Sequence, residues 1–154
     1  MSVIVRTAGL SDTAALVGLA VQARVFHNRL SDNYFADPDP RAESLFFKQA
    51  VTDENKIILA AEKNGAVAGF LLACLKKLPY LRRPSVCLVE TVCVDRNCRR
   101  EGIGKALMTE LQARCVRRGV DEIRLGVFAA NTAGVAFYQA LGFTVQEQKM
   151  QLFL

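Results

Sequence analysis

The feature that most constrains the fold is a nearly uninterrupted apolar run, Val86–Val94, which leads through a short basic loop into a helical pattern. β-Branched residues dominate the run, and both of its alternating faces are apolar apart from Glu90. Such a run predicts a strand that is buried on both sides. A strand of this kind needs a layer of other structure above and below it, so the chain is expected to form a layered domain.

Hydrophobic periodicity extends this pattern over the rest of the chain. Asn64-Gly65 separates two apolar runs, which predicts a β-hairpin with a two-residue type I′ turn. We expect an α/β (α+β) domain of three layers, with a mixed and mostly antiparallel sheet flanked by helices. The expected elements are a strand over 3–6, a helix with Ser11 as N-cap, a polar loop over 27–40, a helix over about 41–51, strands over 57–62, 66–76 and 86–94, a helix over 102–118, a strand over 122–127, a helix over 131–141 and a final strand from 143 to about 152.

Length and composition indicate one folded unit. A chain of 154 residues that is 51% hydrophobic and 23% charged can form one core, so we take residues 1–154 as a single domain. Its longest uncharged apolar run, 66–75, is about half of the ~20 residues that a membrane span needs. Arg6 and Asp12 stand where a signal peptide would hold its apolar stretch. We therefore expect a soluble, cytoplasmic protein with no membrane partner.

The cysteines do not form a metal-binding pattern. There are five of them without a C-x-x-C pair, and His27 is the only histidine. Most of the cysteines stand in apolar strand or helix patterns, where a free thiol acts as a small hydrophobic side chain. We expect structural thiols and no metal.

Charge is distributed unevenly along the chain. Residues 96–118 contain seven Lys or Arg against two Glu, a net charge of +5, whereas residues 27–55 have a net charge of −3. Either run, taken alone, fits a solvated face. The basic run also contains two glycines between a strand and a helix, in Arg99-Arg100-Glu101-Gly102-Ile103-Gly104. The N–H groups and dipole of a helix N-terminus favour phosphate at such a position.

Two common phosphate loops do not fit this segment. A dinucleotide fingerprint needs glycine where Leu107 stands, and a P-loop needs Ser or Thr where Ala106 stands. The positive charge by itself would also suit nucleic acid, but the chain lacks an aromatic-rich strand on which bases could stack. No nucleic-acid partner is therefore expected.

The segment resembles the main motif of the GNAT superfamily of acetyl-CoA-dependent N-acetyltransferases, in which Arg99–Gly104 follows the strand Glu90–Val94. The downstream motif of that family is matched by Asn131 and by Ala136-Phe137-Tyr138-Gln139-Ala140-Leu141-Gly142-Phe143. Val5-Arg6-Thr7-Ala8 with Asp12 is similar to the first strand and turn of the family. The resemblance implies acetyl-CoA as co-substrate and a sheet that splays beside the strand before the glycines.

The resemblance also implies roles for single residues. Backbone N–H groups from about Arg100 to Lys105 would hold the pyrophosphate, and the N–H near Val92 would polarise the thioester carbonyl. Tyr138 would be the general acid for the leaving thiolate; its spacing alone favours a half-buried structural tyrosine beside Phe137, and its position in the motif favours the functional role. The residues so implied at the cofactor are Val92, Cys93, Val94, Arg99, Arg100, Glu101, Gly102, Ile103, Gly104, Lys105, Asn131 and Tyr138.

Glu90 is the expected catalytic base. A carboxylate inside an apolar strand is costly to bury, and burial would raise its pKa and suit it to accept a proton. The alternatives are a structural Glu with a partner and an exposed residue at a bulge.

The leading functional hypothesis is acetyl transfer from acetyl-CoA to a primary amine by direct attack in a ternary complex. The acidic 27–55 region contains Tyr34, Phe35, Phe46 and Phe47 and favours a small cationic amine as substrate. A protein N-terminus or lysine as acceptor, and a non-catalytic acyl-CoA sensor, remain alternatives. Family likeness implies a homodimer.

Overall fold

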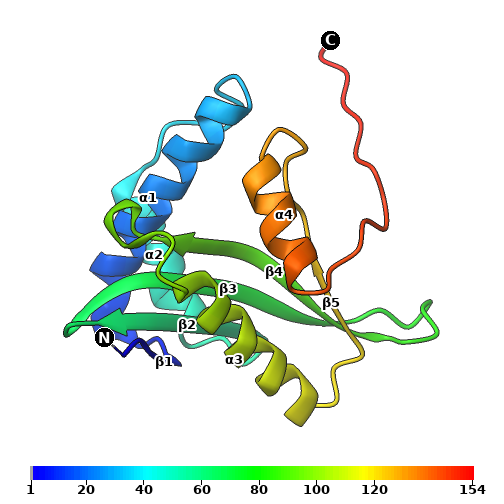
Figure 1. Cartoon of the computed structure of the whole chain (residues 1–154), viewed down its shortest axis with the longest axis horizontal. Helices are drawn as coiled ribbons and strands as arrows, with labels where there is room; N and C mark the ends of the chain where they lie inside the picture. The colour runs from blue at the N-terminus through cyan, green and yellow to red at the C-terminus, as the bar shows by residue number, and fades with distance from the viewer. Residues whose placement is uncertain (1) are drawn as a thin grey trace.

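A five-stranded sheet in the order β1-β2-β3-β4-β5 forms the middle of the protein (Figure 1). The computed structural model describes residues 2–154. The strands are β1 (Ile4–Thr7), β2 (Lys56–Lys63), β3 (Ala66–Lys77), β4 (Ser85–Val94) and β5 (Glu122–Leu125). The helices are α1 (Thr13–Leu30), α2 (Pro40–Ala50), α3 (Ile103–Arg117) and α4 (Thr132–Ala140), with short 3-10 turns η1 (Leu10–Asp12) and η2 (Arg96–Cys98).

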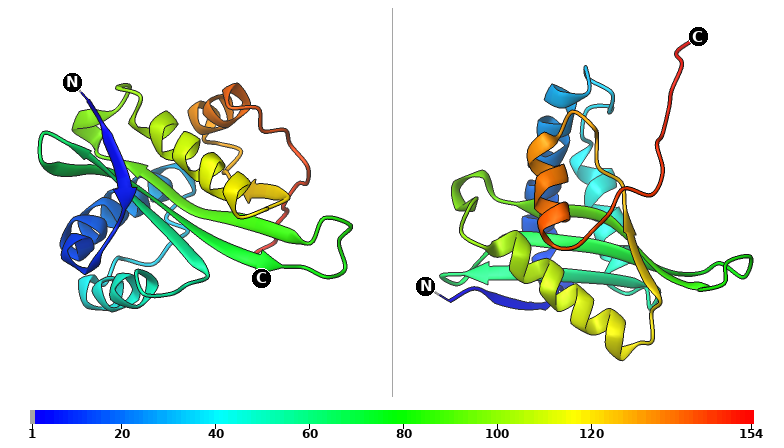
Figure 2. Two further views of the ribbon diagram at one scale, coloured as in Figure 1. Left: turned by 90° about the horizontal axis from the view of Figure 1, so that it is seen from below. Right: turned by 45° about the vertical axis from the view of Figure 1, so that its right-hand side comes forward.

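Helices cover both faces of the sheet, with α1 and α2 on one face and α3 and α4 on the other (Figure 2). On the first face, Leu16 and Phe47 pack with Phe70 of β3. On the second face, Leu107 and Leu111 pack with Leu71, the next residue of the same strand. Because β3 supplies apolar side chains to both cores, the predicted three-layer α/β fold is confirmed.

The sheet opens beside β4. The first four strands pair antiparallel, whereas β5 returns through α3 and pairs parallel to β4 over Val86–Val89 alone. A bulge lies in β4 at Glu90, because Ala73 pairs with Val89 and Leu72 with Thr91. From Glu90 onward, β4 therefore has β3 on one side and no paired residue of β5 on the other. This is the splay that the resemblance implies.

The hairpin between β2 and β3 confirms the turn prediction. Asn64 has φ 53° and Gly65 has φ 77°, so both central residues have the left-handed backbone conformation that a type I′ turn requires.

The expected final strand is wrong. Residues 143–154 form no strand, and in two views the chain leaves the end of α4 and extends away from the sheet (Figures 1 and 2). A strand needs a partner edge and a regular apolar face, but the polar run 146–149 interrupts the alternation and β5 offers a short edge. The side chains of Val145, Met150, Leu152, Phe153 and Leu154 are exposed.

Three boundary predictions also need correction. Ser11 lies in η1 and does not cap α1, whose N-cap residue is Asp12. Asp12 accepts two hydrogen bonds from the Arg6 guanidinium, at 2.8 and 2.9 Å, and one from Gly9 N, at 2.8 Å. Helix α1 continues to Leu30, inside the expected loop, and β5 ends at Leu125. Within residues 2–154, no helix combines the length and the apolar character needed to cross a lipid bilayer.

Candidate functional site

The N-terminus of α3 offers a set of backbone donors. Gly102 is its N-cap residue, with φ 81° and no side chain to accept from the first turn. The first intrahelical bond runs from Ala106 N to Gly102 O, at 2.9 Å. The N–H groups of Ile103, Gly104 and Lys105 precede that bond and have no acceptor inside the helix. This end of α3 therefore fits a phosphate or pyrophosphate.

The loop before α3 is fixed by α1. Gln22 Nε2 donates to Asp95 Oδ2 at 2.9 Å, and Gln22 Oε1 accepts from Arg96 N at 3.2 Å. Asp95 also accepts from Asn97 N at 2.8 Å and caps η2. These bonds hold the basic loop in one position. Sequence reasoning missed Gln22, because nothing in the helical pattern of α1 marks it as a partner of residues so distant in the chain.

Two glycines let α3 lie close to its neighbours. A Cβ on Gly104 would be 3.3 Å from Cζ of Phe137, so this glycine serves the contact between α3 and α4 as well as the approach of a ligand. A Cβ on Gly69 of β3 would be 2.9 Å from both Cys93 O and Cγ2 of Ile103. Gly69 was not among the predicted residues, yet it sets the height of the α3 N-terminus above the sheet.

The charged side chains of the loop differ in their surroundings. Arg99 lies over the ring of Phe26, 5.2 Å from its centroid. Arg100 is exposed and has φ 67°, and Lys105 is exposed as well. The carboxylate of Glu101 forms an ion pair with Lys63. Because Lys63 offsets this acidic charge, the loop keeps the positive charge that a polyanion needs.

The splayed half of β4 places its side chains in both cores. Val92 and Val94 pack with the core on the α3 side, and Cys93 packs on the α1 side. Cys93 Sγ donates to Leu19 O at 3.1 Å, and burial raises the pKa of this thiol to about 11. It is therefore a neutral core thiol at physiological pH. Because β5 pairs only with Val86–Val89, the backbone edge of β4 beyond Val89 is unpaired on that side.

The expected burial of Glu90 is wrong. Its side chain is 38% exposed at the β4 bulge, and both of its carboxylate oxygens lie 3.3 Å from Lys56 Nζ. The Lys56 ammonium is also 5.6 Å from the ring centroid of Phe46 in α2. A bulge turns its extra residue out of the alternation, which is why the apolar run did not reveal the exposure. Glu90 thus faces α2 and has a basic partner.

Helix α4 brings Asn131 and Tyr138 to the other side of the opening. Asn131 caps α4 at the start of the helix expected over 131–141, with its Oδ1 accepting from Gly134 N at 3.0 Å. The Tyr138 ring contacts Phe137 and Phe143, at centroid distances of 5.1 and 5.8 Å. Burial raises the pKa of its phenol. Tyr138 therefore stays protonated at neutral pH and can donate a proton.

The structure brings part of the predicted cofactor set together, whereas Cys93 packs in the other core. Val92, Val94, Ile103 and Tyr138 belong to the same apolar cluster, and the α3 N-terminus lies next to it. Glu90 precedes Val92 on the same strand but faces α2.

Comparison with known proteins agrees with this geometry. The family model for the acetyltransferase (GNAT) family matches residues 23–143. The chain belongs to the GNAT acetyltransferase family. A mycothiol acetyltransferase from Salinispora arenicola is 32% identical over 126 residues, which cover 81% of this chain and 39% of that protein. The chain thus spans less than half of the length of this curated relative.

Solved structures share the fold over nearly the whole chain. A single-residue mutant of the BH1408 protein from Bacillus halodurans has a TM-score of 0.90 and 26% identity, covering 98% of this chain and 99% of that one. AAC(6')-Iy, solved in complex with a bisubstrate analog that contains CoA, has a TM-score of 0.78 and 20% identity, covering 100% of this chain and 99% of that one. At this identity the second likeness shows the fold alone.

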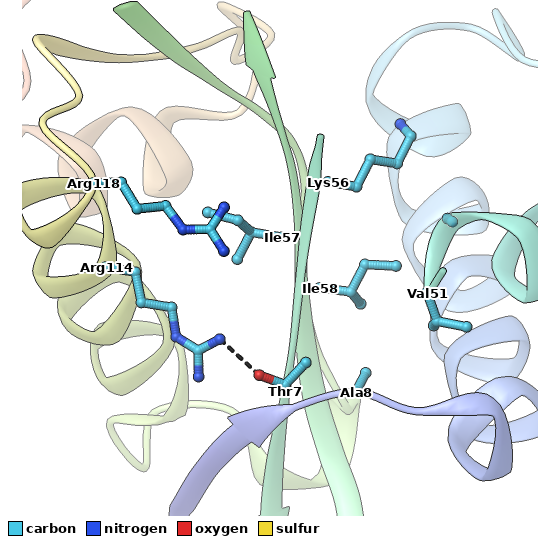
Figure 3. A pocket seen from close by; sticks show the side chains of 9 residues that line it. Thr7, Ala8, Val51, Lys56, Ile57, Ile58, Arg114 and Arg118 are labelled. Atoms are coloured by element: carbon cyan, nitrogen blue, oxygen red, sulfur yellow. Dashed lines mark hydrogen bonds between the residues drawn. The ribbon is translucent and has the colours of Figure 1, made fainter. Parts of the chain in front are cut away.

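One cavity of this GNAT domain lies away from the predicted site. It has a volume of about 100 Å³ at the edge of β2 beyond the end of β1, and Ile57 and Ile58 flank it on opposite sides of the strand (Figure 3). Arg114 and Arg118 reach it from the C-terminal turn of α3, and Arg114 donates to the Thr7 hydroxyl at 2.7 Å. None of the predicted site residues lines this cavity. Within residues 2–154, no group of His, Cys, Asp or Glu is arranged to hold a metal.

Proposed function

We propose that this GNAT chain transfers an acetyl group from acetyl-CoA to a primary amine by direct attack in a ternary complex. The observation that carries the proposal is the opening beside β4, which has free N–H groups of α3 at one end and Tyr138 beside it. When bound, acetyl-CoA supplies a thioester carbonyl that the amine attacks. We assign no acyl-enzyme, because Cys93, the thiol in the unpaired half of β4, is buried and protonated.

The cofactor contacts are assigned to backbone and basic groups. N–H groups of Ile103, Gly104 and Lys105 bind the pyrophosphate, while Arg99 and Arg100 add positive charge. The unpaired side of β4 at Val92 offers an N–H that stabilises charge on the thioester oxygen. Asn131 and Glu101 border this site from α4 and from the loop.

Two side chains are assigned to proton transfer. As the C–N bond forms and the C–S bond breaks, Tyr138 gives its proton to the leaving thiolate. Glu90 accepts the proton from the amine, through water, and Lys56 holds its carboxylate in place. Since Glu90 faces α2, we assign the acceptor to the α1 and α2 side and the cofactor to the α3 side. The acidic 27–55 region on that side supports a small cationic amine.

The test is a screen of acetyl-CoA consumption over polyamines, amino acids, aminoglycosides and short peptides, with calorimetric binding of acetyl-CoA in parallel. We expect turnover of at least one small amine. Tyr138→Phe should lower kcat by about 10²–10⁴-fold while the Kd for acetyl-CoA changes less than about threefold. Glu90→Gln should lose activity mainly at low pH, where more of the amine is protonated.

Other outcomes identify the alternatives. Tight binding of acetyl-CoA without turnover of any amine would favour a sensor. A strong preference for peptides would favour a protein acetyltransferase. Full kcat in Tyr138→Phe would show that water or another group protonates the thiolate.

We also propose that the chain is a homodimer in which the C-terminal segment, residues 143–154, contacts a second copy. Its exposed apolar side chains support this assignment, because a contact with another molecule would remove them from water. Light scattering should give about twice the chain mass of 16.9 kDa, and deletion of residues 145–154 should give a monomer. A monomeric full-length chain would reject the dimer.

A further inference from the structure

Four aromatic rings, here called the ring cluster, lie between α1 and the chain that precedes α4: His27, Tyr34, Phe35 and Phe128. Phe128 is 5.8 Å from His27, 5.9 Å from Phe35 and 6.1 Å from Tyr34, measured between ring centroids. Tyr34 is 50% exposed and Phe35 is 37% exposed. The cluster therefore has an apolar interior and ring surface that faces solvent.

The loop that carries two of these rings is braced. The Asn28 side chain accepts from Phe35 N at 2.8 Å and donates to Phe35 O at 3.0 Å. Asn33 N donates to Asn28 O at 3.0 Å, and Asp32 and Asn33 both have positive φ, at 51° and 57°. Because α1 continues to Leu30 and supplies Asn28, the rings are presented in one arrangement. A site that is already formed loses less conformational entropy on binding.

The ring cluster adjoins the proposed active site. Asn131 N donates to Phe128 O at 2.8 Å, so Phe128 is tied to the N-cap of the helix that carries Tyr138. On the other side, His27 contacts Phe26, which lies under Arg99 of the basic loop. The end of α1 and the chain before α4 lie at the same end of the molecule (Figures 1 and 2). The cluster thus joins the two walls of the opening at its outer end.

The chemistry of the ring cluster favours a cation. The faces of aromatic rings carry partial negative charge and attract ammonium groups. Burial lowers the pKa of His27, so its imidazole is neutral at physiological pH and adds no positive charge. The loop over residues 31–39 contains three Asp and no Lys or Arg. Apolar rings and an acidic loop together complement an organic cation.

A cation site at the outer end of the opening implies a second charge on the acceptor. The amine that attacks the thioester must be deprotonated, so its charge cannot hold the acceptor in the reactive complex. We propose that the ring cluster binds a second, protonated amino group of the acceptor, which makes the substrate a diamine or larger polycationic amine. This inference rests on the proposed acetyl transfer and extends it to the class of the substrate.

The test compares short linear diamines with alkyl monoamines of the same chain length, at saturating acetyl-CoA. The wild type should show a kcat/KM at least tenfold higher for its best diamine. Tyr34→Leu removes the aromatic face at a half-exposed position and should reduce that preference by about threefold to thirtyfold, mainly through KM. Tyr34→Phe keeps the ring and should behave like the wild type. Tyr80→Leu, at an exposed tyrosine between β3 and β4, is the remote control.

Binding measurements separate this inference from the proposed function. Calorimetry of the best-binding diamine, in the presence of CoA, should show weaker binding to Tyr34→Leu and unchanged binding to Tyr80→Leu. If no amine is acetylated but this difference appears, acetyl transfer is rejected and the cation site stands. If turnover occurs with equal kcat/KM for monoamines and diamines, or if Tyr34→Leu matches the wild type in both assays, the ring cluster is not a cation site.

Discussion

Gly69→Ala should disturb the proposed cofactor site from beneath it. The added methyl would meet Cys93 O and Cγ2 of Ile103, both at 2.9 Å, which is closer than a Cβ approaches other heavy atoms in folded proteins. The Cys93 carbonyl is backbone, and Ile103 is fully buried and β-branched, so neither can turn away. The first turn of α3 must therefore rise by a few tenths of an ångström. Overpacking of this kind costs about 1–3 kcal/mol of unfolding free energy.

The same displacement moves the N–H groups of Ile103, Gly104 and Lys105, which we propose bind the pyrophosphate. We expect the Kd for CoA to rise about tenfold, which corresponds to about 1.4 kcal/mol. Urea unfolding and calorimetric titration with CoA measure the two effects separately. Gly18→Ala is the matched control, because its Cβ would meet nothing within 4 Å on α1. It should stabilise the chain by up to about 1 kcal/mol. Equal stability and equal CoA affinity in the two variants would refute the packing argument.

Three further predictions follow from single contacts. Gly104→Val should weaken CoA binding at least tenfold by calorimetry, and Phe137→Leu in the same chain should recover part of the loss; an unchanged Kd in Gly104→Val would contradict this. Because burial raises the Tyr138 pKa above its ordinary value of 10, kcat should not fall between pH 7 and 9.5 through loss of this proton, and a fall that Tyr138→Phe abolishes would count against it. Asp12→Asn should lower the unfolding free energy by about 1–2 kcal/mol at pH 7, a modest figure because Arg6 is 40% exposed. Since Arg6 lowers the pKa of Asp12 below 3.8, the difference should be present above pH 3.8 and disappear as the pH falls below it, as urea unfolding at pH 7 and pH 2.5 would show.

Local rules predicted the parts of this protein that depend on neighbours in the chain. Asn64-Gly65 predicted its hairpin because both residues tolerate positive φ. Asn131 predicted a helix start because its side chain can accept from the first turn. The apolar run before Arg99 predicted a strand buried on both faces, and the family resemblance supplied the opening beside it.

Predictions that depended on distant partners were the ones that failed. Glu90 was expected to be buried, but a bulge in β4 turns it toward Lys56 on another strand. Residues 143–152 were expected to form a strand, but strand formation depends on an available edge. Ser11 was expected to cap α1, but the ion pair of Asp12 with Arg6 fixes the chain differently at this turn. In each case the outcome depended on contacts between elements, either formed or missing, and the local pattern did not contain them.

The sequence by itself determined the layered fold and the basic glycine loop at the start of α3, because hydrophobic periodicity and backbone freedom are properties of short segments. Only the tertiary structure decided that Gln22 fixes the loop, that Gly69 sets the height of α3, and that Tyr34 meets Phe128. These contacts join segments far apart in the chain. Their geometry depends on how the helices pack on the twisted sheet, and no local pattern of residues encodes that packing.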